Sequence, residues 1–256
     1  MADKPAAIVV NRLKFGDLTS ALKSGLSDFF KAPLFGLFFG GFYALGGIGL
    51  FYAIFELDLL WFAYPMVIGF ALIGPFVATG LYEVSRRIEE SRPLSWRRIL
   101  TVIWEQHRRE LGWMAFVMLF IFWIWMYQVR TLVAIFFGSS GFASFEDLIS
   151  VIFTTRTGWT FLAVGHLIGA VVSLVLFAIT VISCPMLLDR DVDFVTAMLT
   201  SIRAVFASPS VMLMWGVFVI VCILLSAIPA FLGLLFVLPI LGHATWHLYK
   251  RAVDYS

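Results

Sequence analysis

Long apolar stretches alternate with shorter polar segments along the chain, and six of the stretches are long enough to span a membrane as helices. A helix needs about 20 mostly apolar residues to cross a hydrocarbon core about 30 Å thick. The predicted spans are residues 33–55, 61–82, 111–137, 159–188, 211–230 and 231–249. The last two touch, and Pro229 and Gly233 predict a tight turn between them. One long helix over 211–249 is the alternative, but Pro229 and Pro239 argue against it because proline breaks the helical hydrogen-bond ladder.

A segment with one-sided hydrophobicity precedes each odd-numbered span, after an N-terminal tail of residues 1–16. These segments are residues 17–32, 94–110 and 193–208. Spacings of three and four residues place the large apolar side chains of the first and third segments on one helical face. These side chains are Leu18, Leu22, Leu26, Phe29 and Phe30 in the first, and Phe194, Met198, Ile202, Val205 and Phe206 in the third. Ile99, Ile103 and His107 form a looser version in the middle. We expect all three helices to lie flat on the inner membrane surface.

Matching positions suggest an internal repeat. Asp17 and Asp193 begin the first and third amphipathic segments, where a carboxylate can cap a helix. A proline lies in the cytoplasmic half of each even-numbered span, at Pro75, Pro185 and Pro239. The chain is therefore predicted to be an all-α integral membrane protein, a single domain over 1–256. It is built as three repeats of an interfacial amphipathic helix followed by two spanning helices.

Composition agrees with a membrane location. Apolar residues make up 61% of the 256 residues and charged residues only 13%, whereas a soluble domain carries about 25% charged residues. The net charge of +2 gives no reason to expect a nucleic-acid partner. Cys184 and Cys222 both fall inside apolar segments and are expected to act as small packing residues.

The positive charges predict the orientation. All but two of the 18 Lys and Arg residues lie in the N-terminal segment, the connections after spans two and four, or the C-terminal tail. The exceptions are Arg130 and Arg156. Since basic residues remain on the cytoplasmic side, both chain ends of this multi-pass protein are predicted to be cytoplasmic.

The most basic connection follows span two. It holds Arg86, Arg87, Arg97, Arg98, Arg108 and Arg109, which we predict to contact anionic lipid headgroups, although the same residues also serve as the orientation signal.

The histidines are the side chains best suited to a cofactor. His243 and His247 are four residues apart and share a helical face, which is half of a metal-site geometry. His166 lies within the fourth predicted span, where an ionisable group is costly and often functional. A hydrogen bond to a neighbouring group is the alternative for each. The three lie at different predicted depths and cannot share one metal, so no metal and no cofactor are expected.

Small residues predict tight helix packing. Gly36 and Gly40 in the first span, and Gly165 and Gly169 in the fourth, are spaced one turn apart and allow close backbone approach in lipid. The partner face of each pair is left open by the sequence: another helix of this chain, or another subunit.

No catalytic residues are predicted. The sequence contains no nucleotide-binding glycine loop, no HExxH and no CxxC, and no order of Ser, His and Asp typical of hydrolases. We therefore expect a protein that is not an enzyme.

Three sequence stretches resemble an uncharacterised bacterial inner-membrane family, domain of unknown function 2189, and the resemblance implies that this chain lies in a bacterial inner membrane. They are DLTSALKSGLSDFFKAPLFGLFFGGFYALGG, IGPFVATGLYEVSRRIEES and LPILGHATWHLYKR, and the resemblance extends over about residues 12–252. Members are sometimes labelled cytochrome c oxidase subunits. A catalytic oxidase subunit needs several histidines for two haems and a copper, which this chain cannot supply.

Two functions remain open from the sequence. The first is a non-enzymatic accessory, assembly or scaffold component of another membrane complex, such as a respiratory oxidase. The alternative is a small-solute channel or transporter that runs between the repeats and is lined by His166, Ser173 and the carbonyls freed by prolines.

Overall fold

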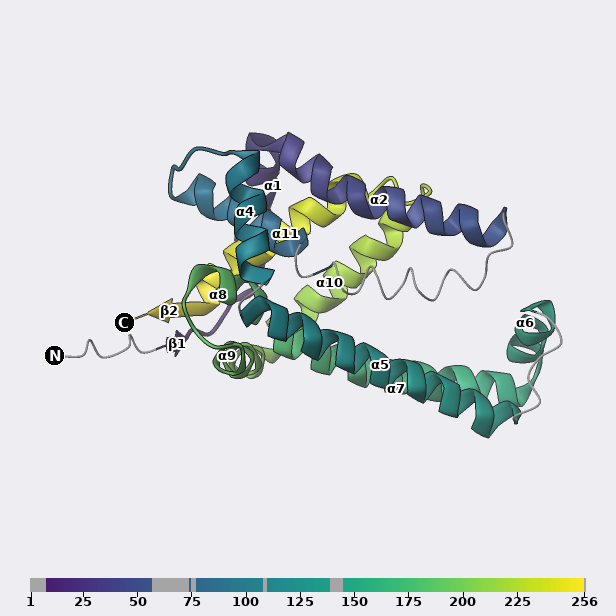
Figure 1. The fold of residues 1–256 in the computed structure, drawn as a ribbon. Helices are drawn as coiled ribbons and strands as arrows, with labels where there is room; N and C mark the ends of the chain where they lie inside the picture. The colour runs from purple at the N-terminus through teal and green to yellow at the C-terminus, as the bar shows by residue number, and fades with distance from the viewer. Residues whose placement is uncertain (1–7, 57–73, 75–76, 108–109, 139–144, 256) are drawn as a thin grey trace. The chain divides into compact units, whose positions relative to one another are not determined.

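The computed structural model describes residues 8–56, 74, 77–107, 110–138 and 145–255, which are almost entirely helical (Figure 1). The helices are α1 (Phe15–Lys31), α2 (Pro33–Phe55), α4 (Trp96–His107), α5 (Glu110–Phe137), α6 (Phe145–Thr154), α7 (Arg156–Thr180), α8 (Ser183–Asp189), α9 (Phe194–Ala207), α10 (Pro209–Ala227) and α11 (Leu234–Ala252). Residues 77–89 are also helical, and two short strands, β1 (Ile8–Val10) and β2 (Val253–Tyr255), lie near the chain ends.

The protein is an all-α membrane protein with four helices, among the described residues, that are long and apolar enough to cross a bilayer. These are α2, α5, α10, and α7 taken together with α8. The predicted span 61–82 lies mostly outside the described residues. The last predicted span, 231–249, corresponds to α11, which is not one of the four. Its C-terminal half carries His243, His247, Lys250 and Arg251, which lower its hydropathy.

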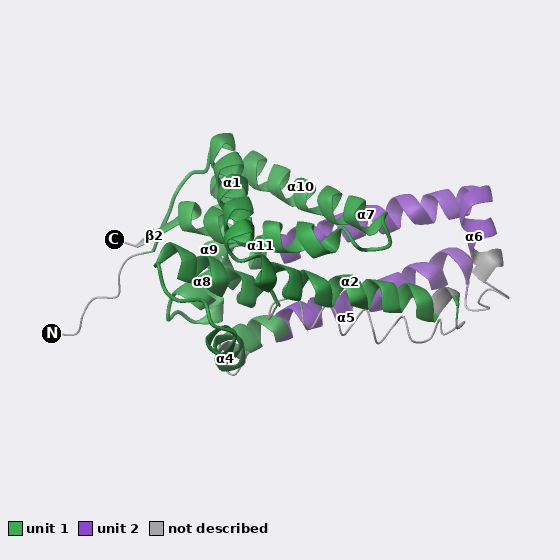
Figure 2. Ribbon diagram, turned by 90° about the horizontal axis from the view of Figure 1, so that it is seen from above, with its two compact units in different colours: residues 1–115, 178–256 green, residues 116–177 purple. Residues whose placement is uncertain are grey.

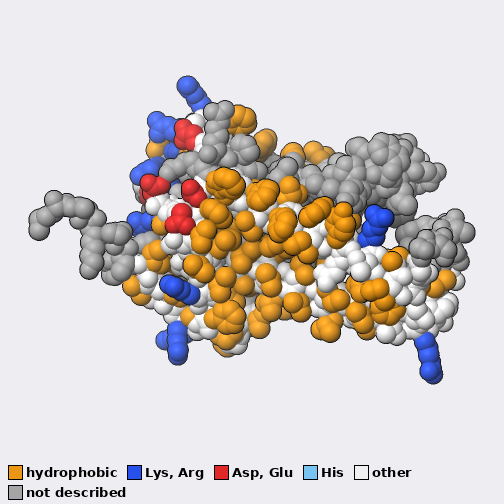
Figure 3. Space-filling view, turned by 60° about the horizontal axis from the view of Figure 1, so that its bottom comes forward, with side chains coloured by type: hydrophobic (Ala, Val, Ile, Leu, Met, Phe, Trp, Pro, Cys, Tyr) orange, Lys and Arg blue, Asp and Glu red, His pale blue; other side chains and the backbone are white. Residues whose placement is uncertain are grey.

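Apolar side chains cover much of the outer surface, as lipid contact requires. In α2 the exposed ones recur on one face, at Leu34, Phe38, Phe42 and Leu45. The view in Figure 3 shows hydrophobic side chains over most of one face, with its acidic side chains gathered in one place. Exposed apolar area on this scale exceeds what a monomeric soluble protein presents to water.

The chain forms two compact units (Figure 2). Unit 1 contains residues 1–115 and 178–256, and unit 2 contains residues 116–177. Unit 2 is a helical hairpin of α5 and α7 with α6 at its turn, where Phe136 and Phe137 both meet the ring of Phe161. The sequence predicted no helix between the spans 111–137 and 159–188, so α6 was missed.

The closest packing in unit 1 joins the first and last helices. The face of α1 that is buried consists of Leu18, Ala21, Gly25, Asp28 and Phe29. A Cβ placed on Gly25 would lie 2.5 Å from the backbone nitrogen of Ala244 in α11, so only glycine permits this approach. Small residues allow helix backbones to come together in lipid, where apolar burial adds little.

The large apolar side chains that the sequence places on one face of α1 are therefore not all buried. Leu18 and Phe29 face the protein, whereas Leu26 and Phe30 are exposed, Phe30 by 70%. Three of the residues that contact the protein most closely (Ala21, Gly25 and Asp28) lie beside the stripe and not in it.

Helix α9 repeats this arrangement. Its buried face includes Ala197, Thr200, Ser201 and Ala204, while Phe206 is 76% exposed. The residues that end α1 and α9 also match: Ala32 has φ −136° and ψ 52°, Ser208 has φ −142° and ψ 58°, and a proline begins the next helix in both cases.

Helix α4 differs from the other two, because the two isoleucines of its predicted stripe pack inward; the side chain of His107, the third member, lies outside the described part of the structure. Ile99 is fully buried against Phe35, Phe39 and Leu81, and Ile103 packs against the same cluster. The exposed apolar side chains of α4 are instead Trp96, Leu100 and Trp104.

The fourth predicted span, 159–188, is not one continuous helix. Regular structure ends at Thr180 and resumes at Ser183, close before Pro185. A proline disturbs the turn that precedes it. The backbone nitrogen of Ile182 donates to Ser201 Oγ in α9 at 3.1 Å, which satisfies a group that the break leaves free.

A turn between α10 and α11 and a short pair of strands complete the fold. A turn over residues 228–233 separates α10 from α11, with positive φ at Ala230 (50°) and Phe231 (63°), where the sequence predicts a turn. Strands β1 and β2 pair antiparallel, with Val9 opposite Asp254, so the two ends of the described chain lie side by side. Strands of three residues leave too short a pattern for the sequence to predict.

The α1–α11 contact predicts opposite effects for two alanine substitutions. Gly25→Ala should lower the thermal unfolding midpoint of the detergent-solubilised protein, since overpacking costs about 1–3 kcal/mol. Gly16→Ala, in the same helix but with nothing within 4 Å of a Cβ, should leave the midpoint unchanged or raise it. Equal midpoints for Gly25→Ala and wild type would contradict the close approach.

Candidate functional site

Four polar side chains meet in the interior of unit 1, and we call them the polar cluster: Asp28, Ser85, His243 and His247. They come from α1, from the helix of residues 77–89, and from α11. His247 Nε2 lies 2.7 Å from Asp28 Oδ2, and Ser85 Oγ lies 2.8 Å from His243 Nδ1. Asp28, Ser85 and His243 are each at most 3% exposed. A buried polar group is tolerated when hydrogen bonds replace its water, as they do for Asp28, Ser85 and His243 Nδ1. His243 Nε2 is buried and has no hydrogen-bond partner among the described residues.

The polar cluster keeps Asp28 ionised. Burial acts to raise the pKa of the Asp28 carboxyl, but hydrogen bonds from His247 and Ser85 and the nearby imidazoles outweigh it and hold the pKa below its ordinary value of 3.8. The carboxylate thus joins α1 to α11 through His247 and to residues 77–89 through Ser85.

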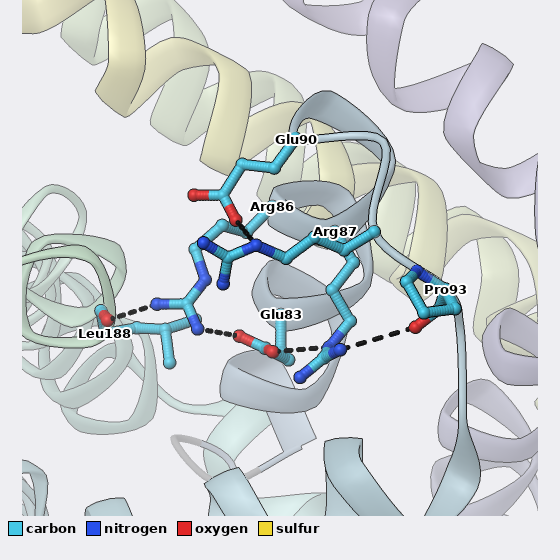
Figure 4. Close-up of polar contacts among 7 residues, drawn as sticks. Glu83, Arg86, Arg87, Glu90, Pro93 and Leu188 are labelled. Atoms are coloured by element: carbon cyan, nitrogen blue, oxygen red, sulfur yellow. Dashed lines mark hydrogen bonds and ion pairs between the residues drawn. The ribbon is translucent and has the colours of Figure 1, made fainter.

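An ion cluster lies on the same helix as Ser85 (Figure 4). Glu83 is fully buried and forms ion pairs with Arg86 and Arg87, each at 2.6 Å, and it accepts a hydrogen bond from Arg87 Nε. Arg86 also donates to the carbonyl oxygen of Leu188 at 2.9 Å, and Arg87 to that of Pro93 at 3.3 Å. The two arginines therefore hold α8 and the connection before α4 against this helix.

Aromatic donors add two further links from α11. Tyr249 Oη donates to Asp189 Oδ2 at 2.7 Å, and Trp246 Nε1 donates to Glu89 Oε2 at 3.1 Å. Lys250 lies 3.4 Å from the same carboxylate of Asp189. Polar contacts at this end of unit 1 thus connect α1, residues 77–89, α8 and α11.

A polar cavity of about 350 Å³ opens beside the Asp28–His247 pair. Its lining comes from α1, from Ile88 and Glu89, and from His247. Seven of its eight lining residues carry an ionisable or hydroxyl group, so its lining is polar.

An apolar groove of about 440 Å³ lies in unit 2 between α5 and α7. It is lined by Trp125, Val129, Leu132, Phe161, Leu162, Gly165, His166, Gly169 and Ala170. A Cβ on Gly165 would meet nothing within 4 Å, whereas one on Gly169 would lie 2.8 Å from the indole ring of Trp125. The groove therefore exposes bare helix backbone at Gly165.

The three predicted histidines do not meet at one site. His243 and His247 belong to the polar cluster in unit 1, and His166 is an exposed residue of unit 2 whose Nδ1 lies 2.7 Å from the carbonyl oxygen of Leu162. Across the described residues, no group of three or more His, Cys, Asp or Glu side chains is arranged to hold a metal ion.

The predicted packing glycines occupy different surroundings. A Cβ on Gly40 would lie 2.7 Å from the carbonyl oxygen of Leu235, and one on Gly36 would lie 2.6 Å from the ring of Phe29. Both therefore face neighbouring elements of this chain, and Gly165 is the member of the two predicted pairs that faces open space.

The arginines predicted to contact lipid headgroups lie in different surroundings. Arg86 and Arg87 are held in the ion cluster with Glu83, so they are structural links more than headgroup contacts. Arg97 and Arg98 are exposed on α4. Arg108 and Arg109 lie outside the described residues.

The sequence prediction missed Asp28 and Ser85. Asp28 carried a signal: it is a lone carboxylate among apolar and small residues in the last turns of α1, on the same face as Ala21 and Gly25. Ser85 carried none, because serine is common in helices of any environment.

Comparison with known proteins identifies a family. A family model described as "Predicted integral membrane protein (DUF2189)" matches residues 63–189. No curated protein and no solved structure matches the chain.

The Asp28 carboxylate makes a testable contribution to stability. Because its pKa is lower in the fold than in the unfolded chain, its contribution is present above the ordinary value of 3.8 and is lost as pH falls through the lower folded value. Asp28→Asn should lower the unfolding free energy at neutral pH by about 1–3 kcal/mol and flatten its decline in acid. Thermal unfolding of the solubilised protein across pH measures both.

Glu90→Gln is the matched control for this prediction. Glu90 pairs with Arg92 on the surface, where both side chains are more than a third exposed. Such a pair contributes little, so the control should retain the wild-type midpoint and pH profile. An Asp28→Asn protein that matched this control would refute the role of the polar cluster.

Proposed function

We propose, since this chain belongs to the DUF2189 family of predicted integral membrane proteins, that it is a non-enzymatic accessory or assembly component of a membrane complex, such as a respiratory oxidase. The groove between α5 and α7 carries the proposal. It presents an apolar surface with exposed backbone at the middle of a membrane-spanning hairpin. Such a surface fits a transmembrane helix of a partner protein.

A helix suits this groove better than a lipid chain does. Gly165 has nothing within 4 Å of a Cβ, and a small residue at such a position lets two helix backbones approach each other in lipid. His166, next to Gly165, presents an exposed imidazole that a helix can meet with a hydrogen-bonding side chain and an acyl chain cannot. Close packing and interhelical hydrogen bonds both contribute to helix association in membranes.

Six membrane crossings explain why the chain leaves one end of unit 1 three times and returns to it each time. We call each departure and return an excursion. The chain leaves Asp28 along α2 and returns at Ser85, which meets His243. It leaves again from Glu110, which accepts from the Phe194 backbone nitrogen at 2.9 Å, and returns at Asp189, which meets Tyr249.

The third excursion follows α10 and returns along α11. It starts beside Ser208, whose hydroxyl accepts from the Leu13 backbone nitrogen at 2.7 Å. Three excursions that each leave and return give an even number of crossings, in agreement with the pairing of β1 and β2 at the chain ends. We infer six, with α11 and the segment before residue 77 as the two spans beyond the four long apolar helices.

The shared end of these excursions is proposed to be cytoplasmic, in the inner membrane of a bacterium. The chain ends and the arginines of residues 86–98 gather there, and translocating so many basic residues is costly. Arg97 and Arg98, exposed on α4 beside Trp96 and Trp104, are placed to meet anionic headgroups.

A repeat of an amphipathic helix and two spans explains the matching features of the first and third excursions. The buried small-residue faces of α1 and α9, the near-identical dihedral angles of Ala32 and Ser208, and the prolines that follow support it. Helix α4 departs from this pattern because it packs its isoleucines inward.

The transporter alternative has no observation in its favour. The described residues that line the groove in unit 2 include a single ionisable side chain, His166, and the rest are apolar or glycine. A polar solute would find few partners there.

Cysteine labelling tests the topology. In a background with Cys184 and Cys222 replaced by alanine, Arg12→Cys and Arg97→Cys should resist a membrane-impermeant maleimide in intact cells and react after permeabilisation. Arg156→Cys, at the start of α7, should react in intact cells. Labelling of Arg97→Cys in intact cells would contradict the proposed crossings.

Co-purification tests the partner. From native membranes in mild detergent, the wild-type protein should carry a membrane protein in constant stoichiometry. Gly165→Leu should reduce its recovery roughly fivefold or more, because overfilling the groove costs about 1–3 kcal/mol.

Gly49→Leu is the matched control, because Gly49 also lies in a membrane-spanning helix with nothing within 4 Å of a Cβ, but outside the groove. It should retain the partner. Recovery of the wild-type protein alone in several mild detergents, or with lipid as the groove's only occupant, would refute the proposal.

A further inference from the structure

The polar cavity of unit 1 has the features of a binding site for a small charged group. At about 350 Å³ it falls within the range of roughly 300–1,000 Å³ typical of ligand pockets. Helix α1 contributes Lys23, Ser24, Ser27 and Lys31, which the helical repeat brings onto one face. Glu89 lines the cavity from the helix of residues 77–89.

The cavity lies beside a surface suited to the membrane boundary. On α1, the helical repeat puts the exposed side chains of Leu26 and Phe30 next to the face that carries Lys23 and Ser27. A helix with an exposed apolar face flanked by lysines is typical of the boundary between headgroups and acyl chains. The cavity therefore lies where a phospholipid headgroup would be found.

Two donor groups in the cavity match a phosphate. Neither Lys23 nor Lys31 forms an ion pair with another described residue. Ammonium groups and serine hydroxyls are both good donors to phosphate oxygens, and charge-assisted bonds of this kind are roughly twice as strong as neutral ones.

The carboxylates of the cavity differ in what they can accept. Asp28 is already paired with His247 at 2.7 Å. Glu89 is exposed and receives a hydrogen bond from Trp246 on Oε2 alone, so the rest of its carboxylate can accept from a primary amine. Phosphate donors and an amine acceptor therefore stand within one cavity.

We propose that this cavity binds a phosphoethanolamine group, with the phosphate on Lys23 and Lys31 and the amine on Glu89. The group can arrive as the headgroup of phosphatidylethanolamine or as a soluble phosphate ester. The proposal is independent of the partner groove, because the cavity belongs to unit 1 and the groove to unit 2.

Native mass spectrometry of the solubilised full-length protein tests the proposal. Phosphatidylethanolamine, phosphatidylcholine and phosphatidylglycerol with identical acyl chains are added separately, and a dissociation constant is obtained for each. We expect phosphatidylethanolamine to bind roughly tenfold more tightly than phosphatidylcholine, whose trimethylated nitrogen cannot donate to Glu89.

Variants separate the two halves of the site. Lys23→Gln with Lys31→Gln should weaken phosphatidylethanolamine binding roughly tenfold or more, since both phosphate contacts are lost. Glu89→Gln should remove the preference over phosphatidylcholine. Arg12→Gln with Lys14→Gln, which removes two charges outside the cavity, should change neither.

A second control concerns a different surface. Arg97→Gln with Arg98→Gln should weaken phosphatidylglycerol binding while the preference for phosphatidylethanolamine over phosphatidylcholine remains. This contrast distinguishes a built headgroup site from general attraction to basic residues.

Competition with soluble phosphoethanolamine identifies the source of the group. Displacement of bound phosphatidylethanolamine assigns the cavity to the lipid headgroup, and binding of the ester without retention of lipid assigns it to a soluble ester. Equal affinity of wild type for phosphatidylethanolamine, phosphatidylcholine and phosphatidylglycerol, or unchanged affinity in the Lys23→Gln/Lys31→Gln protein, would overturn the proposal.

Discussion

The structure of unit 1 depends on burying charged and polar groups where segments far apart in sequence come together. Asp28 and His247 are separated by most of the chain, yet their side chains pair at 2.7 Å. Removing either partner would leave a polar or charged group in a setting with little water, a penalty that can exceed the gain from the pair itself. A shift of α1 along α11 by one helical turn would separate the two groups, so the pair also favours the observed register.

Close backbone contact makes this pairing possible. Gly25 lets α1 rest on the backbone of α11 near Ala244, and that approach brings Asp28 within reach of His247. Gly40 gives α2 the same closeness to the start of α11 at Leu235. In lipid, where apolar side chains gain little by leaving their surroundings, such contacts and the hydrogen bonds they permit are the main source of helix association.

The helices could largely be predicted from the sequence, but their burial could not. Apolar length predicted α2, α5 and α10, and the helical repeat predicted α1 and α9, because both signals are local. The stripe of Leu26 and Phe30 was also read correctly as apolar, but in a membrane protein large apolar side chains face lipid as readily as protein. The buried face of α1 follows the small residues instead. The polar cluster was missed because its members come from three helices that are far apart in sequence, and only the fold brings them into contact.

The pairing of the first amphipathic helix with the last helix has a consequence for biosynthesis. Asp28 leaves the ribosome 219 residues before His247. Until then the carboxylate has no imidazole to bind, and the glycine face of α1 has no backbone to rest on. Contacts of such long sequence separation form late. Until α11 is made, the fold of unit 1 therefore lacks the contact on which the placement of α1 depends.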